Sequence, residues 1–257
     1  MNTNRHLKFL FNVGRDKPNS IRHKDTLCPF CNKENLAEIL DEDGPIILVT
    51  NKYPTLEDTY QTVLIETDDC NADMSIYDKD HMRKLLSFGV KHWLHMEKSG
   101  KFKSVIFYKN HGPNSGGSIK HSHMQIVGLE TIDYKDFLQD EYFEGITIHE
   151  ADGCILNVST KPQANFTEFN IIIDNIDKLD IMADNIQKIV HYILINYPAK
   201  CDSFNLFFYD WKGKIICKAV PRFVTSPLLL GYFISQTSSN IDKMAADIQQ
   251  LYFKDSN

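Results

Sequence analysis

The stretch SVIFYKNHGPNSGGSIKHSHMQIVGL, residues 104–129, decides the fold. It reads as a strand, a glycine-rich loop and a second strand that begins at residue 121. Side chains alternate between the two faces of a strand, so His121, His123 and Gln125 point to one side. The opposite side is mainly apolar, as in a strand that is anchored in a core. The sequence therefore predicts one surface on which three polar groups converge.

The loop before the second strand runs over residues 110–120 and combines glycines with small polar residues. Glycine has no Cβ, so the backbone N–H groups of such a loop approach a ligand closely and can hold phosphate oxygens. Ordinary turns are also rich in glycine, and it is the neighbouring histidines that favour a ligand site here. The loop residues that we expect to bind substrate are Asn110, Gly116, Gly117 and Ser118.

A second motif, C-P-F-C, occupies residues 28–31. Cys28 and Cys31 have the two-residue spacing of a zinc knuckle, which needs two further ligands from elsewhere in the chain. The candidates are Cys70 and a histidine. A thioredoxin-like redox pair is the alternative, but that motif belongs at the start of a helix after a strand, and polar residues flank this one. We favour the metal knuckle.

The rest of the chain reads as a fold that is built twice. Residues 1–27 are polar and are expected to form an arm, and after them strand, helix and strand patterns occur in the same order in both halves. We expect an α+β fold with halves at residues 1–135 and 136–257. The expected elements outside residues 104–129 are strands over 45–50, 61–66, 171–173, 204–208 and 215–220, and helices over 75–98, 181–195 and 241–253.

Composition excludes several classes of function. The 257 residues carry a net charge of −6 and are 42% hydrophobic, enough for an ordinary core and unsuited to general binding of nucleic acid. No stretch approaches the roughly 18 apolar residues of a membrane span. Six cysteines are too few for a disulfide scaffold. We therefore expect a cytoplasmic protein with neither nucleic acid nor membrane as a partner.

These motifs resemble the galactose-1-phosphate uridylyltransferase branch of the histidine-triad (HIT-like) superfamily, whose neighbours include ADP-glucose phosphorylases and dinucleoside tetraphosphate phosphorylases. The family pattern of an Asn, a glycine loop, a Ser and His-x-His-x-Gln lies over residues 110–125 without a gap. Its C-x-x-C knuckle lies over residues 28–31, and its loop after a strand lies over residues 51–54. The resemblance covers about residues 22–129 and implies two tandem HIT-like halves, each with an antiparallel sheet and packed helices, the second of them degenerate.

The resemblance also implies roles for single residues. His123 matches the nucleophile, and Gln125 matches the group that hydrogen-bonds the phosphoryl oxygen. His121 matches a zinc ligand, and Cys70 stands where the family commonly has a histidine ligand, which would give one structural zinc on Cys28, Cys31, Cys70 and His121. Asn51 and Tyr53 match the residues that contact the nucleotide base, and they do not distinguish uracil, adenine and guanine.

The implied activity is a nucleotidyltransferase or phosphorylase that acts on a nucleoside diphosphate sugar or a dinucleotide through a covalent nucleotidyl-histidine. The acceptor would be phosphate or a sugar phosphate. Gln125 cannot titrate and so cannot protonate a poor leaving group, which favours phosphate leaving groups. The alternatives are a pyrophosphatase-type hydrolase and a zinc-containing nucleotide-binding protein whose catalysis has decayed. Relatives are often dimers, so a homodimer is one expectation.

Overall fold

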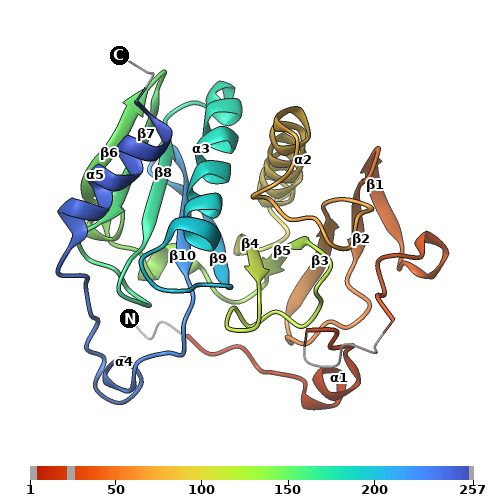
Figure 1. The fold of residues 1–257 in the computed structure, drawn as a ribbon. Coiled ribbons are helices and arrows are strands. Elements are labelled where there is room, and N and C mark those ends of the chain that lie inside the picture. Colours follow the sequence, from red (N-terminus) through yellow and green to blue (C-terminus); the bar gives the residue numbers. More distant parts are fainter. Residues whose placement is uncertain (1–4, 22–26, 255–257) are drawn as a thin grey trace. The chain divides into compact units, whose positions relative to one another are not determined.

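The computed structural model describes residues 5–21 and 27–254, and the chain divides into two compact units (Figure 1). Unit 1 comprises residues 1–73 and 87–137, and unit 2 comprises residues 74–86 and 138–257. None of the described helices is both long and apolar enough to cross a membrane.

Unit 1 is built on five antiparallel strands in the order β1-β2-β3-β5-β4. The strands are β1 (Ile39–Asp43), β2 (Ile46–Thr50), β3 (Thr59–Ile65), β4 (Ser104–His111) and β5 (His123–Leu129). The short helix α1 (Phe11–Asp16) lies in the segment that we expected to be an arm. The long helix α2 (Lys79–Lys98) begins in unit 2 and ends in unit 1. The Asp78 carboxylate accepts the backbone N–H groups of Asp80 and His81, so α2 begins at residue 79 and not at 75.

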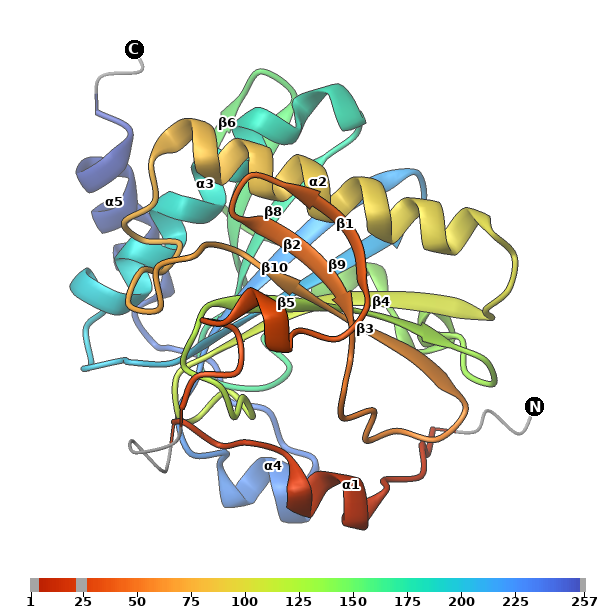
Figure 2. The ribbon, with the colours of Figure 1, turned by 90° about the vertical axis from the view of Figure 1, so that its right-hand side faces the viewer.

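The two faces of the unit 1 sheet have different roles. On one face α2 packs so closely that a Cβ on Gly89 would lie 2.7 Å from Phe107 and 3.1 Å from Leu64. The strand register places Val63 opposite Gln125 on the other face. Figure 2 shows α2 and the segment with α1 on opposite sides of these strands. The strand begins at His123 and not at 121 as predicted, so His121 precedes it. The predicted placement of His123 and Gln125 on one face of β5 is confirmed, and that face lies away from α2.

Unit 2 has five antiparallel strands in the order β6-β7-β8-β10-β9. They are β6 (Gly145–Ala151), β7 (Cys154–Ser159), β8 (Phe169–Ile173), β9 (Phe204–Trp211) and β10 (Lys214–Pro221). Helix α3 (Leu179–His191) packs on β7, β8 and β10, and a π-helical turn (Tyr192–Asn196) follows it. The helices α4 (Pro227–Tyr232) and α5 (Ile241–Tyr252) complete the unit, with α5 against β6 and β7.

The two units connect their strands in the same order, with a helix after the third strand of each, so the prediction of an α+β fold built twice is confirmed. In unit 1 His123 pairs with Ile65, the last residue of β3. In unit 2 Ile215 pairs with Ile173, the last residue of β8. Ile215 therefore takes the place of His123, and a two-residue turn at 212–213 replaces the long glycine loop. Unit 2 lacks a histidine at this position.

The sequence patterns identified most of the strands and missed β1, β6 and β7. The predicted strands at 45–50 and 61–66 correspond to β2 and β3. The strands β1 and β6 carry many acidic or polar residues at the edges of their sheets, whereas the missed strand β7 is an interior one, between β6 and β8. The predicted helix at 181–195 runs as α3 and then as the π-helical turn.

Candidate active site

A cavity with about 600 Å³ of empty space lies on the face of the unit 1 sheet away from α2. His123 and Gln125 of β5 line it, together with Asn51 and Tyr53 from the loop after β2. Its lining is mainly apolar with a few polar side chains, as in sites for small ligands. The structure thus brings together the two expected catalytic residues and the two expected base-binding residues, although more than 60 positions of sequence separate the pairs.

The His123 ring is fixed in a defined state at the wall of this cavity. Its side chain is only 7% exposed, and its Nδ1 lies 2.8 Å from the carbonyl oxygen of His121. Nδ1–H donates to that carbonyl, so Nε2 keeps the free lone pair. Burial, aided by the charges of Lys109 and Lys17, lowers the pKa of His123 to about 3. The imidazole is therefore neutral at neutral pH.

Phe30 also belongs to this site, and sequence reasoning missed it. Its ring meets the His123 ring edge to face, with centroids 5.3 Å apart, and it lines the cavity. It meets the His121 ring in the same way at 5.9 Å. Phe30 lies between Cys28 and Cys31 in the chain, so the knuckle itself supplies a wall of the cavity. The aromatic residue inside the C-P-F-C motif was the only available signal for this role.

Asn51 organises the loop that carries Tyr53. Its Oδ1 accepts the backbone N–H of Tyr53 at 2.9 Å, an Asx turn that fixes the direction of the chain after β2. Its Nδ2 lies 3.5 Å from Oε1 of Gln61. Tyr53 is half-buried at the cavity wall. Contact of these two residues with a nucleotide base stays a prediction.

Of the glycine loop, residues 110–120, Ile119 lines the cavity. Gly116 needs its glycine because its φ is +85°, and a Cβ on Gly117 would lie 3.3 Å from the Asn110 Cβ. The Ser118 hydroxyl is buried and has no hydrogen-bond partner within the described part of the chain. Among the expected loop residues, Asn110, Gly116, Gly117 and Ser118 are absent from the described lining of the cavity. Their contact with substrate stays a prediction.

The four expected metal ligands gather in one place. The ligand atoms of Cys28, Cys31, Cys70 and His121 all lie within 4.8 Å of one another. The Nδ1 of His121 is 3.4 Å from the Cys28 sulfur and 3.6 Å from the Cys31 sulfur. In tetrahedral zinc sites Zn–S bonds of about 2.3 Å and Zn–N bonds of about 2.0 Å place these atoms about 3.5 Å apart. The donor set and its spacing fit one zinc ion.

The surroundings of the cluster also favour a cation. The Nε2–H of His121 donates to the Thr67 carbonyl at 2.7 Å, which leaves Nδ1 as the ligand atom. Burial and the neighbouring sulfurs raise the pKa of Cys31 to about 12. Burial also acts to raise the pKa of Cys28, but hydrogen bonds with His121 and Cys31 outweigh it and lower the value to about 6. Three thiolates this close repel one another, and a divalent cation among them removes that repulsion.

Comparison with known families gives two matches that together span most of the chain. Residues 9–132 match the N-terminal domain of DUF4931, a domain of unknown function, and residues 135–253 match its C-terminal domain. The crystal structure of a DUF4931 family protein from Bacillus cereus is 48% identical in sequence. The match covers 84% of this chain and 100% of that one, with a TM-score of 0.78. The comparison with curated proteins gives no match.

Two solved structures of lower identity share the fold. An ADP-glucose phosphorylase from Arabidopsis thaliana with bound ADP-glucose is 15% identical, and the match covers 96% of this chain and 99% of that one with a TM-score of 0.71. A uridylyltransferase is also 15% identical, over 88% of this chain and 91% of its own, with a TM-score of 0.72. These likenesses confirm the predicted HIT-like fold. The chain belongs to the DUF4931 family, and its fold is that of the galactose-1-phosphate uridylyltransferase-like proteins.

Proposed function

We propose that this protein is a nucleotidyltransferase or phosphorylase that acts on a nucleoside diphosphate sugar or a dinucleotide. The observation that carries the proposal is the His123 imidazole, whose Nδ1 is hydrogen-bonded to the His121 carbonyl at the wall of a cavity that Gln125 also lines. A neutral imidazole with a free Nε2 is a nucleophile at neutral pH. The likeness in fold to a uridylyltransferase and an ADP-glucose phosphorylase supports the same class of reaction.

The reaction proceeds in two displacements. Nε2 of His123 attacks the α-phosphorus of the donor, the N–P bond forms, and the bond to the bridging oxygen breaks. The leaving group, a sugar 1-phosphate in the case of a nucleotide sugar, takes the electron pair of that bond. An oxygen of the acceptor, phosphate or a sugar phosphate, then attacks the same phosphorus, and the imidazole leaves with the electrons of the N–P bond. His123 returns to its starting state.

Gln125 assists through hydrogen bonding alone. Its amide lines the cavity next to His123 on the same face of β5, where its N–H group donates to a phosphoryl oxygen. The amide of Gln125 does not titrate, so this residue gives no proton to the leaving group. Phosphates leave as anions and need none. This residue set supports transfer between phosphates.

We also propose that Cys28, Cys31, Cys70 and His121 hold one zinc ion with a structural role. Four protein ligands leave no position for a reactive water, so bound zinc supplies rigidity and no acid chemistry. The same four residues come from the knuckle, the segment after β3 and the segment just before β5. Holding them together keeps the His121 carbonyl and Phe30 in place against the His123 ring.

Trapping the intermediate tests the proposal. The protein is incubated with UDP- or ADP-sugars labelled in the α-phosphate, and protein-bound label is measured after acid and after base. We expect label that is stable in base, labile in acid and absent from the variant His123→Ala. Absence of such label with every common nucleotide donor contradicts the proposal.

Product analysis separates the proposed reaction from the two alternatives. Transfer predicts that added phosphate or sugar phosphate changes the product and discharges the labelled protein. Hydrolysis at a rate that neither acceptor changes supports a pyrophosphatase instead. Nucleotide binding without turnover, unchanged by His123→Ala, supports a protein whose catalysis has decayed.

A further inference from the structure

The charged residues in the described lining of the cavity are all of one sign. Its described lining contains the lysines Lys17 and Lys52 and no aspartate or glutamate. Gln125, an amide, contributes no charge to it. Lys52 is exposed, whereas Lys17 is partly buried. The cavity therefore contains one partly buried cation for which its described walls provide no counter-ion.

Lys17 forms no hydrogen bond and no ion pair with any residue of the described segments 5–21 and 27–254. Burial is accordingly the sole cause that lowers the pKa of this ammonium. Lys17 and His123 line the same cavity. A partly buried ammonium with no partner among the described residues, in the same cavity as His123, is the arrangement that an anionic substrate would complete.

The N-terminal segment holds Lys17 at this place from both sides. Before it, the Leu10 N–H donates to the Thr55 carbonyl at 2.8 Å. After it, the Ser20 hydroxyl oxygen accepts the Lys120 N–H at 2.9 Å, and the Ile21 N–H donates to the Ser118 carbonyl at 3.2 Å. The segment that carries Lys17 is thus attached to the loop after β2 and to the loop before β5.

The residues after α1 explain why the helix ends before Lys17. Pro18 disfavours helical geometry at the residue before it, and Lys17 has φ −69° and ψ 129°, an extended conformation. Helix α1 consequently ends at Asp16, and both Lys17 and Pro18 line the cavity. The Lys-Pro pair therefore brings a cation into the cavity rather than continuing the exposed helix.

We propose that Lys17 binds the non-bridging oxygens of the phosphoryl group that His123 attacks and is the main reason why the cavity prefers nucleotides to nucleosides. The assignment rests on the proposed function, since that function puts a phosphoryl group beside His123. Lys17 then contributes to both displacements. The phosphoryl group whose negative charge it balances stays in the cavity, while the leaving group departs and the acceptor enters.

Binding measurements with matched variants test the assignment without turnover. Full-length, metal-loaded protein is titrated calorimetrically with UMP, AMP, uridine, adenosine and inorganic pyrophosphate. The variant Lys17→Met removes the charge, Lys17→Arg keeps it, and Lys101→Met removes an exposed charge at the turn between α2 and β4. Circular dichroism and melting temperature check that each variant is folded.

We expect Lys17→Met to weaken the binding of pyrophosphate and of the preferred nucleotide about 10- to 100-fold, the usual effect of one charged hydrogen bond. The binding of the corresponding nucleoside stays unchanged. Lys17→Arg retains most of the affinity, and Lys101→Met resembles the wild type. Equal nucleotide binding by Lys17→Met and the wild type overturns the assignment, as does a wild type without preference for nucleotide over nucleoside.

The result of these binding measurements can be distinguished from the result of the labelling experiment that tests the proposed function. Labelled His123 together with Lys17→Met binding at wild-type strength contradicts the role of Lys17 and leaves the transfer reaction standing. Loss of nucleotide binding in Lys17→Met, in a protein that never forms the labelled histidine, supports the phosphate site and contradicts the transfer reaction.

Discussion

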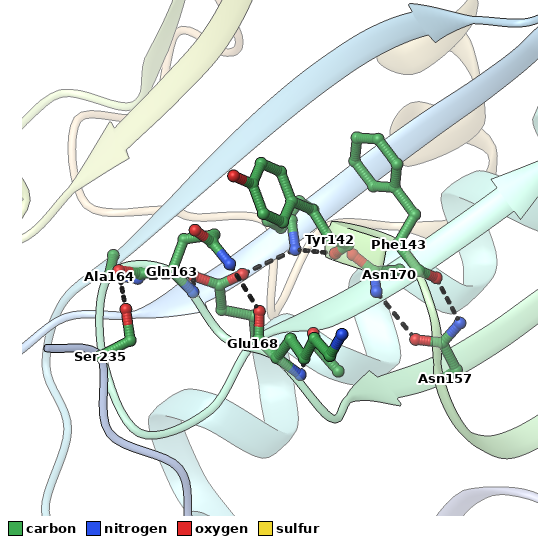
Figure 3. Close-up of polar contacts among 11 residues, drawn as sticks. Tyr142, Phe143, Asn157, Gln163, Ala164, Glu168, Asn170 and Ser235 are labelled. Atoms are coloured by element: carbon green, nitrogen blue, oxygen red, sulfur yellow. Dashed lines mark hydrogen bonds and ion pairs between the residues drawn. The ribbon is translucent and has the colours of Figure 1, made fainter. Parts of the chain in front are cut away.

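The buried ion pair between Glu168 and Lys218 shows how single residues hold unit 2 together. The Lys218 ammonium lies 2.6 Å from Glu168 Oε2 and 2.6 Å from the Tyr142 carbonyl oxygen. The other carboxylate oxygen accepts the N–H groups of Gln163 and Ala164 at 2.7 and 2.9 Å (Figure 3). A buried charge is tolerated only with such complete pairing. The pair fixes the loop before β8 to strand β10.

Removing one partner of this ion pair should therefore lower the free energy of unfolding much more than removing both charges. We expect Lys218→Met to destabilise the protein by about 3–5 kcal/mol, because it leaves the Glu168 carboxylate buried without its counter-ion. The double variant Glu168→Gln with Lys218→Met should recover a large part of the loss. Urea unfolding followed by circular dichroism measures both. A single variant within about 1 kcal/mol of the wild type, the size of a surface pair, would contradict this account.

At the scale of elements, a bidentate ion pair joins the first turns of α2 to α3 within unit 2. Arg83 Nε and Nη2 lie 2.9 and 2.7 Å from the two carboxylate oxygens of Asp184, and Lys79 lies 3.2 Å from one of them. Burial acts to raise the pKa of Asp184, but Arg83 and Lys79 outweigh it, and the net pKa is lowered. The ionised carboxylate is thus favoured in the folded state.

Because the pKa of Asp184 is lowered in the folded state, the stability of unit 2 depends on pH in the acidic range. A carboxyl group whose pKa is lower in the folded than in the unfolded state stabilises the fold at pH values above its pKa in the unfolded state. This contribution is lost as the pH falls through its pKa in the folded state. We expect the variant Asp184→Asn to remove that part of the pH dependence. Thermal melting between neutral and strongly acidic pH compares the two proteins. Parallel curves for wild type and variant at acidic pH would contradict the prediction.

The zinc content of variants tests whether Cys70, in the segment after β3, is a zinc ligand. We expect one zinc per chain in the wild type, and in Cys70→His, because an imidazole is also a zinc ligand. Cys70→Ala should bind zinc more than about 100-fold more weakly, since even partners outside the ligand shell contribute about 10- to 100-fold.

Removal of zinc by a chelator should lower both the melting temperature and the formation of labelled His123, because the ion orders the segments around the nucleophile. Elemental analysis measures the zinc content, calorimetry the melting temperature, and the labelling experiment the amount of labelled His123. Metal removal that changed neither stability nor labelling would contradict the structural role.

At the scale of the whole molecule, the segment between β10 and α5 is unusually apolar for a surface, and Figure 1 shows α4 within it. Val224 is 85% exposed, Leu230 70%, Tyr232 72% and Phe233 88%. Neighbouring exposed side chains of this size mark an interaction site in a soluble protein. The homodimer suggested by the sequence stays a prediction, and this segment is the surface that we expect it to bury.

Light scattering after size-exclusion chromatography measures the oligomeric state. We expect a dimer for the wild type and a monomer for Leu230→Asp combined with Phe233→Asp, because two charges cannot be buried unpaired in an interface. Ile195→Asp, at another exposed apolar residue of unit 2, is the matched control and should leave the dimer intact. A wild-type monomer at micromolar concentration contradicts the prediction.

The sequence by itself determined the local features of this protein. The alternation in His-x-His-x-Gln identified the polar face of β5, and the spacing of Cys28 and Cys31 identified a knuckle, because both depend only on neighbours along the chain. The same holds for the central strands and for the amphipathic part of α2, whose periodicity the chain carries within a few residues. The edge strands, exposed and rich in polar side chains, lack such a pattern.

Only the tertiary structure decided which distant residues share the site. Antiparallel pairing of β2, β3 and β5 places Asn51 and Tyr53 at the cavity of His123, and that register depends on the packing of both faces of the sheet. The attachment of the N-terminal segment brought Lys17 into the same cavity. A local pattern reports the chemistry and period of a segment, whereas the distance between segments is set by burial of their apolar faces against one another.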